Sequence, residues 1–343
     1  MATIRTVADL AGVSTATVSH VINETRAVSA PLTARVLEAM ERLHYHPDVV
    51  ARSLRRRETL TLGLLVPSIE IPFFAVVARD VEAAANEAGY SVILCNSGWS
   101  LRREVRYLND LLARRVDGLL CISLAMTAEH IAPMLRRNTP VVLFDDGTMP
   151  GIELDAVEID NFQGAYDATA HLLALGHRRI GCITGIPNTP LNDARVRGYR
   201  QAIERNGIPF DDALLFTGDY TAASGVRHAR AVFDLTVPPT AVFAFNDLMA
   251  MGVMRAAHAR GMRVPDDVAV IGFDGLALTE HTSPPLSTIV QPTAAMSAAA
   301  IAMLLERIRG RAPAAPRAKI FKATLAARAS TVGYHHGDVS SDV

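Results

Sequence analysis

The stretch "TVADLAGVSTATVSHVIN", residues 6–23, carries two short amphipathic patterns that meet at Gly12. In the first pattern, apolar residues recur at helical spacing behind Thr6, a residue type that caps helices. Gly12 interrupts that pattern, and a second one begins near Thr15 with Ser14 as its candidate cap. We therefore expect two short helices joined by a tight turn.

Two short helices joined by a glycine-containing turn are the helix-turn-helix signature. Ala8 is small where the second helix must cross, and Val18 and Val21 lie on the side that packs against the first helix. The outward side carries Thr15, Ala16, Thr17, Ser19 and His20. Such a side fits base edges and phosphates in the major groove of DNA. The alternative is an ordinary three-helix bundle with a solvated face, because a third helical pattern follows over residues 29–45.

A basic segment, "HPDVVARSLRRRE", covers residues 46–58. It places four arginines within six residues beside an apolar side that includes Leu54. A basic run of this kind is usually a solvated linker. Directly behind a helix-turn-helix, it also fits a short helix whose arginines contact phosphates and whose Leu54 wedges between base pairs in the minor groove. Residues 1–58 hold eight arginines and six acidic residues, so this part of the chain is only mildly basic.

The bulk composition excludes several classes of protein. The chain has 343 residues, 50% hydrophobic residues and a net charge of −1, which suits a globular protein of two or three domains. Its three cysteines lie inside apolar runs, as reduced core residues of a cytoplasmic protein do. No apolar run is long enough to span a membrane, and the first residues lack a signal-peptide pattern. We therefore expect a cytoplasmic protein.

Beyond residue 59, short apolar runs alternate with helical patterns. The runs cover residues 61–68, 90–97, 117–123, 140–146, 179–185, 240–247 and 268–274. This alternation predicts an α/β core with parallel, doubly wound sheets behind the all-α head. A break over residues 148–160 divides the runs, so we expect two such sheets in tandem.

Polar side chains follow most of these runs, where open α/β sheets bind their ligands. The residues expected at the strand ends are Ser68, Asn96, Ser97, Ser123, Asp145, Asp146, Thr184, Asn246, Asp247 and Asp274. The aromatic residues expected nearby are Phe73, Phe74, Trp99 and Tyr220. Each polar residue alone is explained as a strand-end cap, but the set predicts a cleft for a small polyol-like molecule.

The sequence carries no recognisable catalytic motif. It contains no dinucleotide-binding glycine motif, no phosphate-binding lysine loop, no nucleophile elbow and no zinc-protease motif. Lys319 and Lys322 are the only lysines, and the histidines are scattered without clustered cysteine or acidic ligands. We therefore expect no enzyme activity, no cofactor and no metal site.

Residues 3–333 resemble the LacI/GalR family of bacterial transcription regulators. The matching segments are "TVADLAGVSTATVSHVIN" (6–23), "VSAPLTARVLEAMERLHYHPDVVARSLR" (28–55), "IPFFAVVARDVEAAANEAGY" (71–90), "RRVDGLLCIS" (114–123), "GHRRIGCITG" (176–185), "ARVRGYRQAI" (194–203), "AVFAFNDLMAMGVMRAAHARGMRVPDDVAVIGFD" (241–274) and "PPLSTIVQP" (284–292). The resemblance implies a helix-turn-helix head, a hinge helix and a two-lobed core of the periplasmic-binding-protein type, whose lobes the chain crosses three times.

The same resemblance implies domain boundaries. The DNA-binding head covers residues 1–46, and the hinge helix with its linker covers residues 47–59. The core that binds the effector and dimerises covers residues 60–333, and residues 334–343 form a disordered tail. Within the core, lobe 1 comprises about 60–159 and 290–320, and lobe 2 comprises about 160–289 and 321–333.

The resemblance also implies which residues contact DNA. Thr15, Ala16 and His20 occupy base-reading positions of the recognition helix, and the head is most similar to that of the purine-repressor branch of the family. The implied DNA-binding residues are Thr15, Ala16, Thr17, His20, Arg26, Val50, Ala51, Leu54 and Arg55. The implied partners are palindromic double-stranded operator DNA and a second copy of the chain, with no membrane partner.

The implied effector-binding residues are Phe73, Phe74, Asp145, Asp146, Arg195, Tyr220, Asn246 and Asp274. Arg195 matches an arginine that many sugar-responsive members use on ligand hydroxyls. Thr189, Leu191 and Asp146 differ from the residues of the purine-responsive branch. We therefore expect a repressor controlled by a sugar or polyol. The alternatives are a purine-responsive repressor and, more remotely, a solute-binding protein without DNA function.

Overall fold

A computed structural model of the chain describes residues 2–23, 26–45, 58–145 and 149–332. The chain divides into two compact units, residues 1–60 and residues 61–343. Several predicted residues lie outside the described residues: Val50, Ala51, Leu54 and Arg55 of the hinge, Asp146 of the cleft and the tail 334–343.

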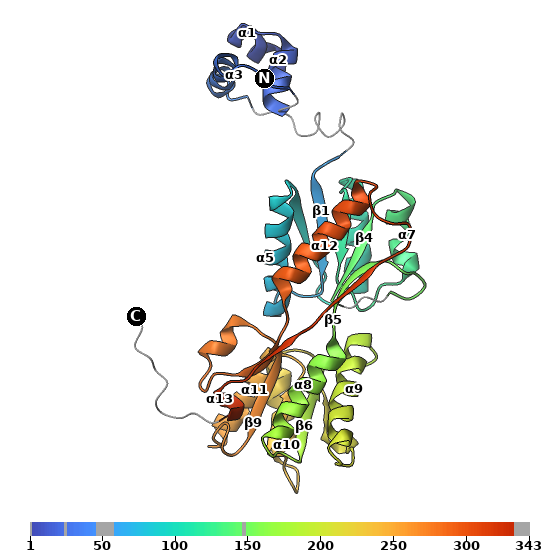
Figure 1. Cartoon of the computed structure of the whole chain (residues 1–343), viewed down its shortest axis with the longest axis vertical. Helices are drawn as coiled ribbons and strands as arrows, with labels where there is room; N and C mark the ends of the chain where they lie inside the picture. Colours follow the sequence, from blue (N-terminus) through green and yellow to red (C-terminus); the bar gives the residue numbers. More distant parts are fainter. Residues whose placement is uncertain (1, 24–25, 46–57, 146–148, 333–343) are drawn as a thin grey trace. The chain divides into compact units, whose positions relative to one another are not determined.

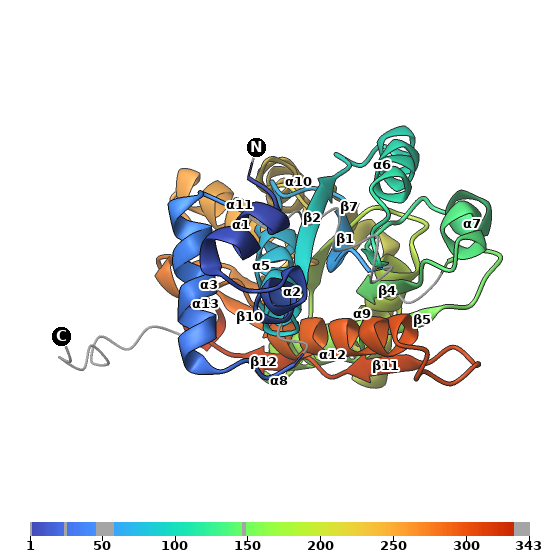
Figure 2. The ribbon, with the colours of Figure 1, turned by 90° about the horizontal axis from the view of Figure 1, so that it is seen from above.

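In the described part of the first unit, three helices form one cluster: α1 (Ile4–Ala11), α2 (Thr15–Asn23) and α3 (Ala30–Arg42) (Figures 1 and 2). Its buried core consists of Val7, Ala8, Ala11, Val18, Val36 and Ala39. Ala8 and Val18 therefore pack where the sequence places them, one on each helix of the helix-turn-helix. The remaining side of α2 is left outside this core.

The helix ends follow local hydrogen bonding. Gly12 ends α1 in the left-handed conformation, with φ at 60°. The backbone N–H of Thr17 donates to Ser14 Oγ over 3.1 Å, so Ser14 caps α2 as expected. The expected cap of α1 is wrong by one turn, because Thr3 is the cap and Thr6 is the third residue of its capping box.

The second unit contains two six-stranded sheets, each belonging to one lobe. The first sheet has the order β11-β5-β4-β3-β1-β2, with all neighbours parallel. Its strands are β1 (Thr61–Val66), β2 (Ser91–Asn96), β3 (Gly118–Cys121), β4 (Val141–Asp145), β5 (Asp155–Ile159) and β11 (Ala318–Phe321). The helices α5 (Pro72–Glu87) and α12 (Thr293–Ile308) pack together on one side of it, and Figure 2 shows α6 (Leu101–Ala113) and α7 (Ala128–Arg136) on the other.

The second sheet has the order β12-β10-β9-β8-β6-β7, parallel except for β12. Its strands are β6 (Ile180–Thr184), β7 (Leu215–Thr217), β8 (Ala241–Ala244), β9 (Ala269–Asp274), β10 (Ser287–Val290) and β12 (Thr324–Ala326). The helices α8 (Asn161–Ala174) and α9 (Pro190–Arg205) pack as one pair, and α10 (Ala222–Phe233) and α11 (Asp247–Ala259) as another. The short helix α13 (Ala329–Val332) packs on β9 and β10.

The chain passes between the lobes three times. β5 of the first sheet leads into α8, β10 of the second sheet leads into α12, and β11 leads into β12 (Figure 1). The expected break over residues 148–160 is partly wrong, because Asp155–Ile159 form β5 inside the first sheet. The crossings bring the carboxyl ends of both sets of parallel strands toward one cleft, where polar and aromatic side chains meet.

Candidate functional site

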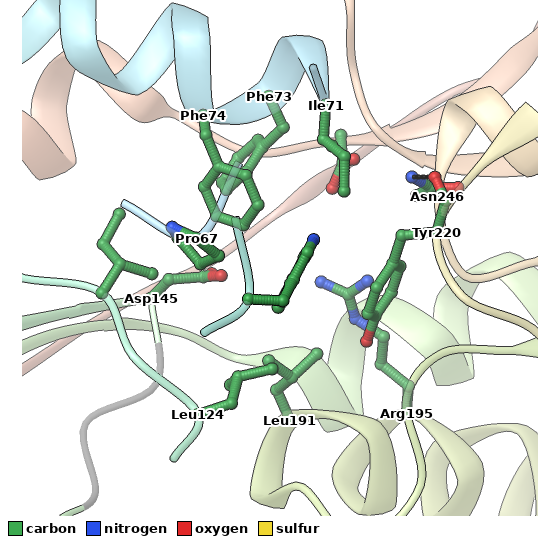
Figure 3. Close-up of a pocket in the computed structure, with 13 residues that line it drawn as sticks. Pro67, Ile71, Phe73, Phe74, Leu124, Asp145, Leu191, Arg195, Tyr220 and Asn246 are labelled. Atoms are coloured by element: carbon green, nitrogen blue, oxygen red, sulfur yellow. Dashed lines mark hydrogen bonds between the residues drawn. The ribbon is translucent and has the colours of Figure 1, made fainter. Parts of the chain in front are cut away.

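A pocket lies between the two lobes of the second unit, beyond the carboxyl ends of their strands (Figure 3). Thirteen described residues line it, most of them apolar or aromatic, as in pockets for small molecules. The first lobe contributes Pro67, Ile71, Phe73, Phe74, Trp99, Ile122, Leu124 and Asp145. The second lobe contributes Leu191, Arg195, Tyr220, Asn246 and Asp274. A ligand in this pocket contacts both lobes at once.

Arg195 is buried on α9 and held in one orientation. Its Nε donates to Asn161 Oδ1 over 2.8 Å, and its Nη1 donates to the carbonyl oxygen of Phe245. Its guanidinium carbon lies 3.7 Å from the centroid of the Phe273 ring. These contacts engage Nε, Nη1 and one face of the guanidinium, and no hydrogen bond to Nη2 is formed within the described residues, so Nη2 remains for a ligand. Figure 3 shows the Arg195 side chain beside Tyr220 in the pocket. A rigid donor of this kind suits ligand oxygens.

Tyr220 precedes α10 and is fixed through its backbone. Its carbonyl oxygen accepts from Asn246 Nδ2 over 2.9 Å, while Asn246 Oδ1 accepts from the backbone N–H of Met249 and caps α11. The Tyr220 hydroxyl lies over Gly185, where an added Cβ would come within 2.0 Å of it. Burial raises the pKa of the Tyr220 phenol, so the group remains a neutral hydroxyl.

Asp274 ends β9 as a buried carboxyl on unusual backbone, with φ at 115°. Its Oδ1 accepts from Gln291 Nε2 over 3.0 Å. Burial raises the pKa of Asp274 well above its usual range, and this outweighs the opposing effect of the Arg195 charge. Asp247 behind it is also buried, and burial raises its pKa to about 7 despite a hydrogen bond from the Thr288 hydroxyl. Asp274 therefore holds its proton to a higher pH than an exposed aspartate does.

Four aromatic rings follow one another along the pocket. The ring centroids of Phe73 and Phe74 are 5.4 Å apart, and those of Phe74 and Trp99 are 6.1 Å apart. Trp99 of the first lobe and Tyr220 of the second are nearly parallel, with an interplanar angle of 14° and centroids 6.5 Å apart. Aromatic faces at such positions suit the apolar face of a sugar or base.

The head presents a second candidate surface on α2. Thr15 and Ala16 of α2 and Arg26 beyond it are exposed, while Thr17 and His20 are half-buried. The Thr17 hydroxyl lies 2.9 Å from Ser14 Oγ, so it supports the start of α2 as well as facing outward. The start of α2 therefore offers short polar side chains on a helix end whose geometry is fixed by capping.

The chain matches two family models: "Bacterial regulatory proteins, lacI family" over residues 3–48 and "Periplasmic binding protein-like domain" over residues 169–331. A relative from Edwardsiella ictaluri, "HTH-type transcriptional repressor PurR", is 42% identical over 90% of this chain and 91% of its own. The homologue of the same name from Photobacterium profundum is 40% identical over 90% of this chain and 92% of its own. The chain belongs to the LacI family.

Solved structures agree with this assignment. A lac repressor dimer bound to operator and an anti-inducer matches with a TM-score of 0.84 and 28% identity, over 96% of this chain and 99% of the other. A complex of the transcriptional regulator CelR with cellobiose matches with a TM-score of 0.74 and 33% identity, over 96% and 100%. This LacI-family chain is accordingly a DNA-binding transcriptional regulator and not an enzyme, and its fold class is as the sequence predicts.

The structure gathers the effector-binding residues that the sequence predicts in its described part. Phe73, Phe74, Asp145, Arg195, Tyr220, Asn246 and Asp274 all line the pocket. Sequence reasoning missed Asn161, which positions Arg195, because the first residue of a helix carries no signal of a partner 34 residues away. It also left Trp99 outside the residues assigned to the effector, although Trp99 lines the pocket.

Several other polar residues at strand ends are structural. Ser97 and Ser123 donate to the buried carboxylate of Glu104, over 3.3 and 2.8 Å. Asn96 Oδ1 accepts from the backbone N–H of Ile69, and Asp247 holds the loop after β9. For these residues the cap interpretation is correct. Among the described residues, no helix is long and apolar enough to cross a bilayer.

Proposed function

We propose that this LacI-family regulator is a cytoplasmic, homodimeric repressor whose affinity for a palindromic operator is set by a sugar or polyol in the pocket between the lobes. The observation that carries the proposal is the pocket itself. It joins a fixed arginine, two buried carboxyls and four aromatic rings within one small volume. Hydrogen-bonding edges combined with apolar faces are what a sugar ring requires.

Relatives support the choice of ligand class. The matched CelR structure is a complex with cellobiose, and a LacI-family regulator from Enterococcus faecium, 31% identical with a TM-score of 0.71 over 79% of this chain and 98% of its own, has bound ribose. A purine is the second candidate, because the curated relatives at 40–42% identity are called PurR repressors. The two candidates make different demands on Arg195 and Asp274.

On the DNA side, Thr15, Ala16 and His20 would read base edges from the start of α2. Thr17 and Arg26 would contact the same stretch of DNA. Val50, Ala51, Leu54 and Arg55 would form the hinge contacts, with Leu54 as the minor-groove wedge. Dimerisation would match a two-fold operator, as in the lac repressor dimer bound to its operator.

The test is a gel-shift titration on palindromic sites near the gene, with and without ligands that raise the melting temperature of the protein. We expect a pentose, hexose or polyol to stabilise the protein and to change its operator affinity at least about tenfold, since allosteric coupling is typically of this order. Stabilisation by purine bases alone would favour the second candidate. A ligand that stabilises the protein without changing operator affinity would count against control by this pocket.

A further inference from the structure

We infer that the effector is an uncharged ring compound that stacks on Trp99 of one lobe, beside Tyr220 of the other, and that the pocket rejects phosphorylated ligands. The inference rests on the proposed function and narrows its ligand class. It makes Trp99 a specificity-determining residue of the site.

The first step concerns how Trp99 is held. It follows Gly98, and both residues have left-handed backbone, with φ at 61° and 60°. The Trp99 backbone N–H donates to the carbonyl oxygen of Pro67 over 3.2 Å, and Ser97 before it donates to the carbonyl oxygen of Val66. The tryptophan is thus fixed in the pocket lining on strained backbone, which persists only where the surrounding structure maintains it.

The second step concerns what Trp99 contacts. Its side chain is 39% exposed, although it is the largest apolar side chain of the lining. Its ring is nearly parallel to that of Tyr220 and lies edge-on to Phe74. An exposed tryptophan fixed parallel to a tyrosine of the opposite lobe leaves apolar ring surface for a ligand to cover. A flat or chair-shaped ring can cover this surface with one of its faces, whereas a linear polyol covers less of it.

The third step concerns charge. Among the lining residues that the structure describes, Arg195 is the one cation, and two of its nitrogens are already engaged. Asp145 and Asp274 are both buried in the same lining. Arg195 therefore already shares the pocket with two carboxyl groups before any ligand binds. A phosphate would add about two negative charges beside these carboxyl groups with no cation left to pair with them.

The test uses the fluorescence of the full-length chain, because Trp99 is its single tryptophan. The probes are D-ribose, D-glucose and adenosine, each titrated beside its 5-, 6- or 5′-phosphate, and sorbitol as the open-chain counterpart of glucose. We expect the tightest probe to be an unphosphorylated ring that changes the Trp99 emission. Its phosphate should bind at least about 100-fold more weakly. The ribose and glucose arms distinguish a sugar from a nucleoside.

Variants test the contact and the charge separately by calorimetry. Trp99→Leu should weaken the tightest probe at least about tenfold, whereas Trp99→Phe, which keeps a ring, should stay within about threefold. Val237→Ala is the matched control, because Val237 is 63% exposed and outside the lining. Asp145→Asn should reduce the difference in affinity between the tightest probe and its phosphate, because it removes a carboxyl group from the lining. Melting temperatures verify that each variant is folded.

Three results would overturn the inference. The first is a phosphorylated probe that binds as tightly as the unphosphorylated compound, and the second is an unchanged affinity of Trp99→Leu for the tightest probe. The third is a difference in affinity between the probe and its phosphate that Asp145→Asn leaves unchanged. None of these results contradicts the proposed function if the bound probe still changes the affinity for the operator. Conversely, an uncharged ring that binds through Trp99 without changing operator affinity would support the inference and contradict the proposed function.

Discussion

At the scale of single residues, the pocket concentrates unusual backbone. Trp99, Asp145, Tyr220 and Asp274 all have positive φ, between 61° and 115°. Each such residue costs about 1 kcal/mol or more relative to ordinary backbone. Two lie in the first lobe and two in the second, so the strain surrounds the cleft. These four side chains line the pocket at some cost in folding stability.

Asp274→Asn should stabilise the protein increasingly as the pH rises. Burial raises the pKa of Asp274 in the folded state, so between its usual value of 3.8 and that higher pKa the folded state binds more protons than the unfolded state. The free energy of unfolding of the wild type therefore falls with rising pH in this window. Asparagine does not titrate, so the variant avoids this fall in stability, and its amide oxygen can still accept the hydrogen bond from Gln291. We expect the advantage to grow steadily as the pH rises above about 4. Urea unfolding at several pH values measures the free energy of unfolding of the wild type and the variant. If the two free energies change with pH in parallel, the prediction is contradicted.

Gly185→Ala should weaken ligand binding through Tyr220. The new Cβ would meet the Tyr220 hydroxyl and ring at 2.0 and 2.1 Å, so the ring must move away from its place opposite Trp99. We expect at least about a tenfold loss of affinity for the probe ligand, measured by calorimetry. In a Tyr220→Ala background the same substitution should cost little more, because the clashing ring is gone. If Gly185→Ala lowers the affinity equally in the wild type and in Tyr220→Ala, the substitution does not act through the Tyr220 ring.

At the scale of elements, the sequence predicts the strands that are apolar throughout and misses those that are not. β5, "DAVEI", interrupts its apolar run with Asp155 and Glu158. Asp155 is buried because Arg307 and Arg317, more than 150 residues later, form ion pairs with it at 2.6 Å. Periodicity along the chain does not contain that information. The same limit applies to Arg195, which the family resemblance identifies, while its partner Asn161 becomes visible only in the fold.

Asp155→Asn should destabilise the first lobe. The carboxylate side chain is 1% exposed and holds Arg307 of α12 and Arg317 before β11 against the start of β5. The arginines are partly exposed, so we expect a loss of about 2 kcal/mol, somewhat below the usual cost of breaking a buried pair. Urea unfolding at neutral pH tests this, with Asp212→Asn, whose ion pair is exposed, as the control.

The same residue predicts an acid response. Burial alone would raise the pKa of Asp155, but hydrogen bonds from Arg307 and Arg317 outweigh it and hold the pKa below 3.8. A carboxyl with a lowered pKa contributes its stability above its usual value and loses it as the pH falls through the folded value. The difference between the wild type and Asp155→Asn should therefore be constant near neutrality and shrink below about pH 4. A difference that shrinks already near pH 6 would contradict this assignment.

At the scale of the whole molecule, the head and the core bury separate apolar clusters. The head packs Val7, Ala8, Ala11, Val18, Val36 and Ala39 among themselves. The second unit begins at Thr61 with a strand whose neighbours, β2 and β3, all belong to that unit. The proposed binding of ligand and the proposed reading of DNA thus fall on units with separate cores, and the proposed control requires that the connection between them transmit the state of the pocket.

A chain that begins at Thr61 should therefore fold and bind ligand but not operator. Its two sheets, the pocket lining and the Asp155 ion pairs are all complete within it, so we expect the probe ligand to bind within about threefold of the full chain. The recognition residues on α2 are absent, so specific operator binding should be lost entirely. Calorimetry and gel shifts measure the two properties side by side. If ligand binding disappears together with operator binding, the head is needed to fold the core, and the two functions are not modular. If both persist, the recognition helix is not the operator-reading element.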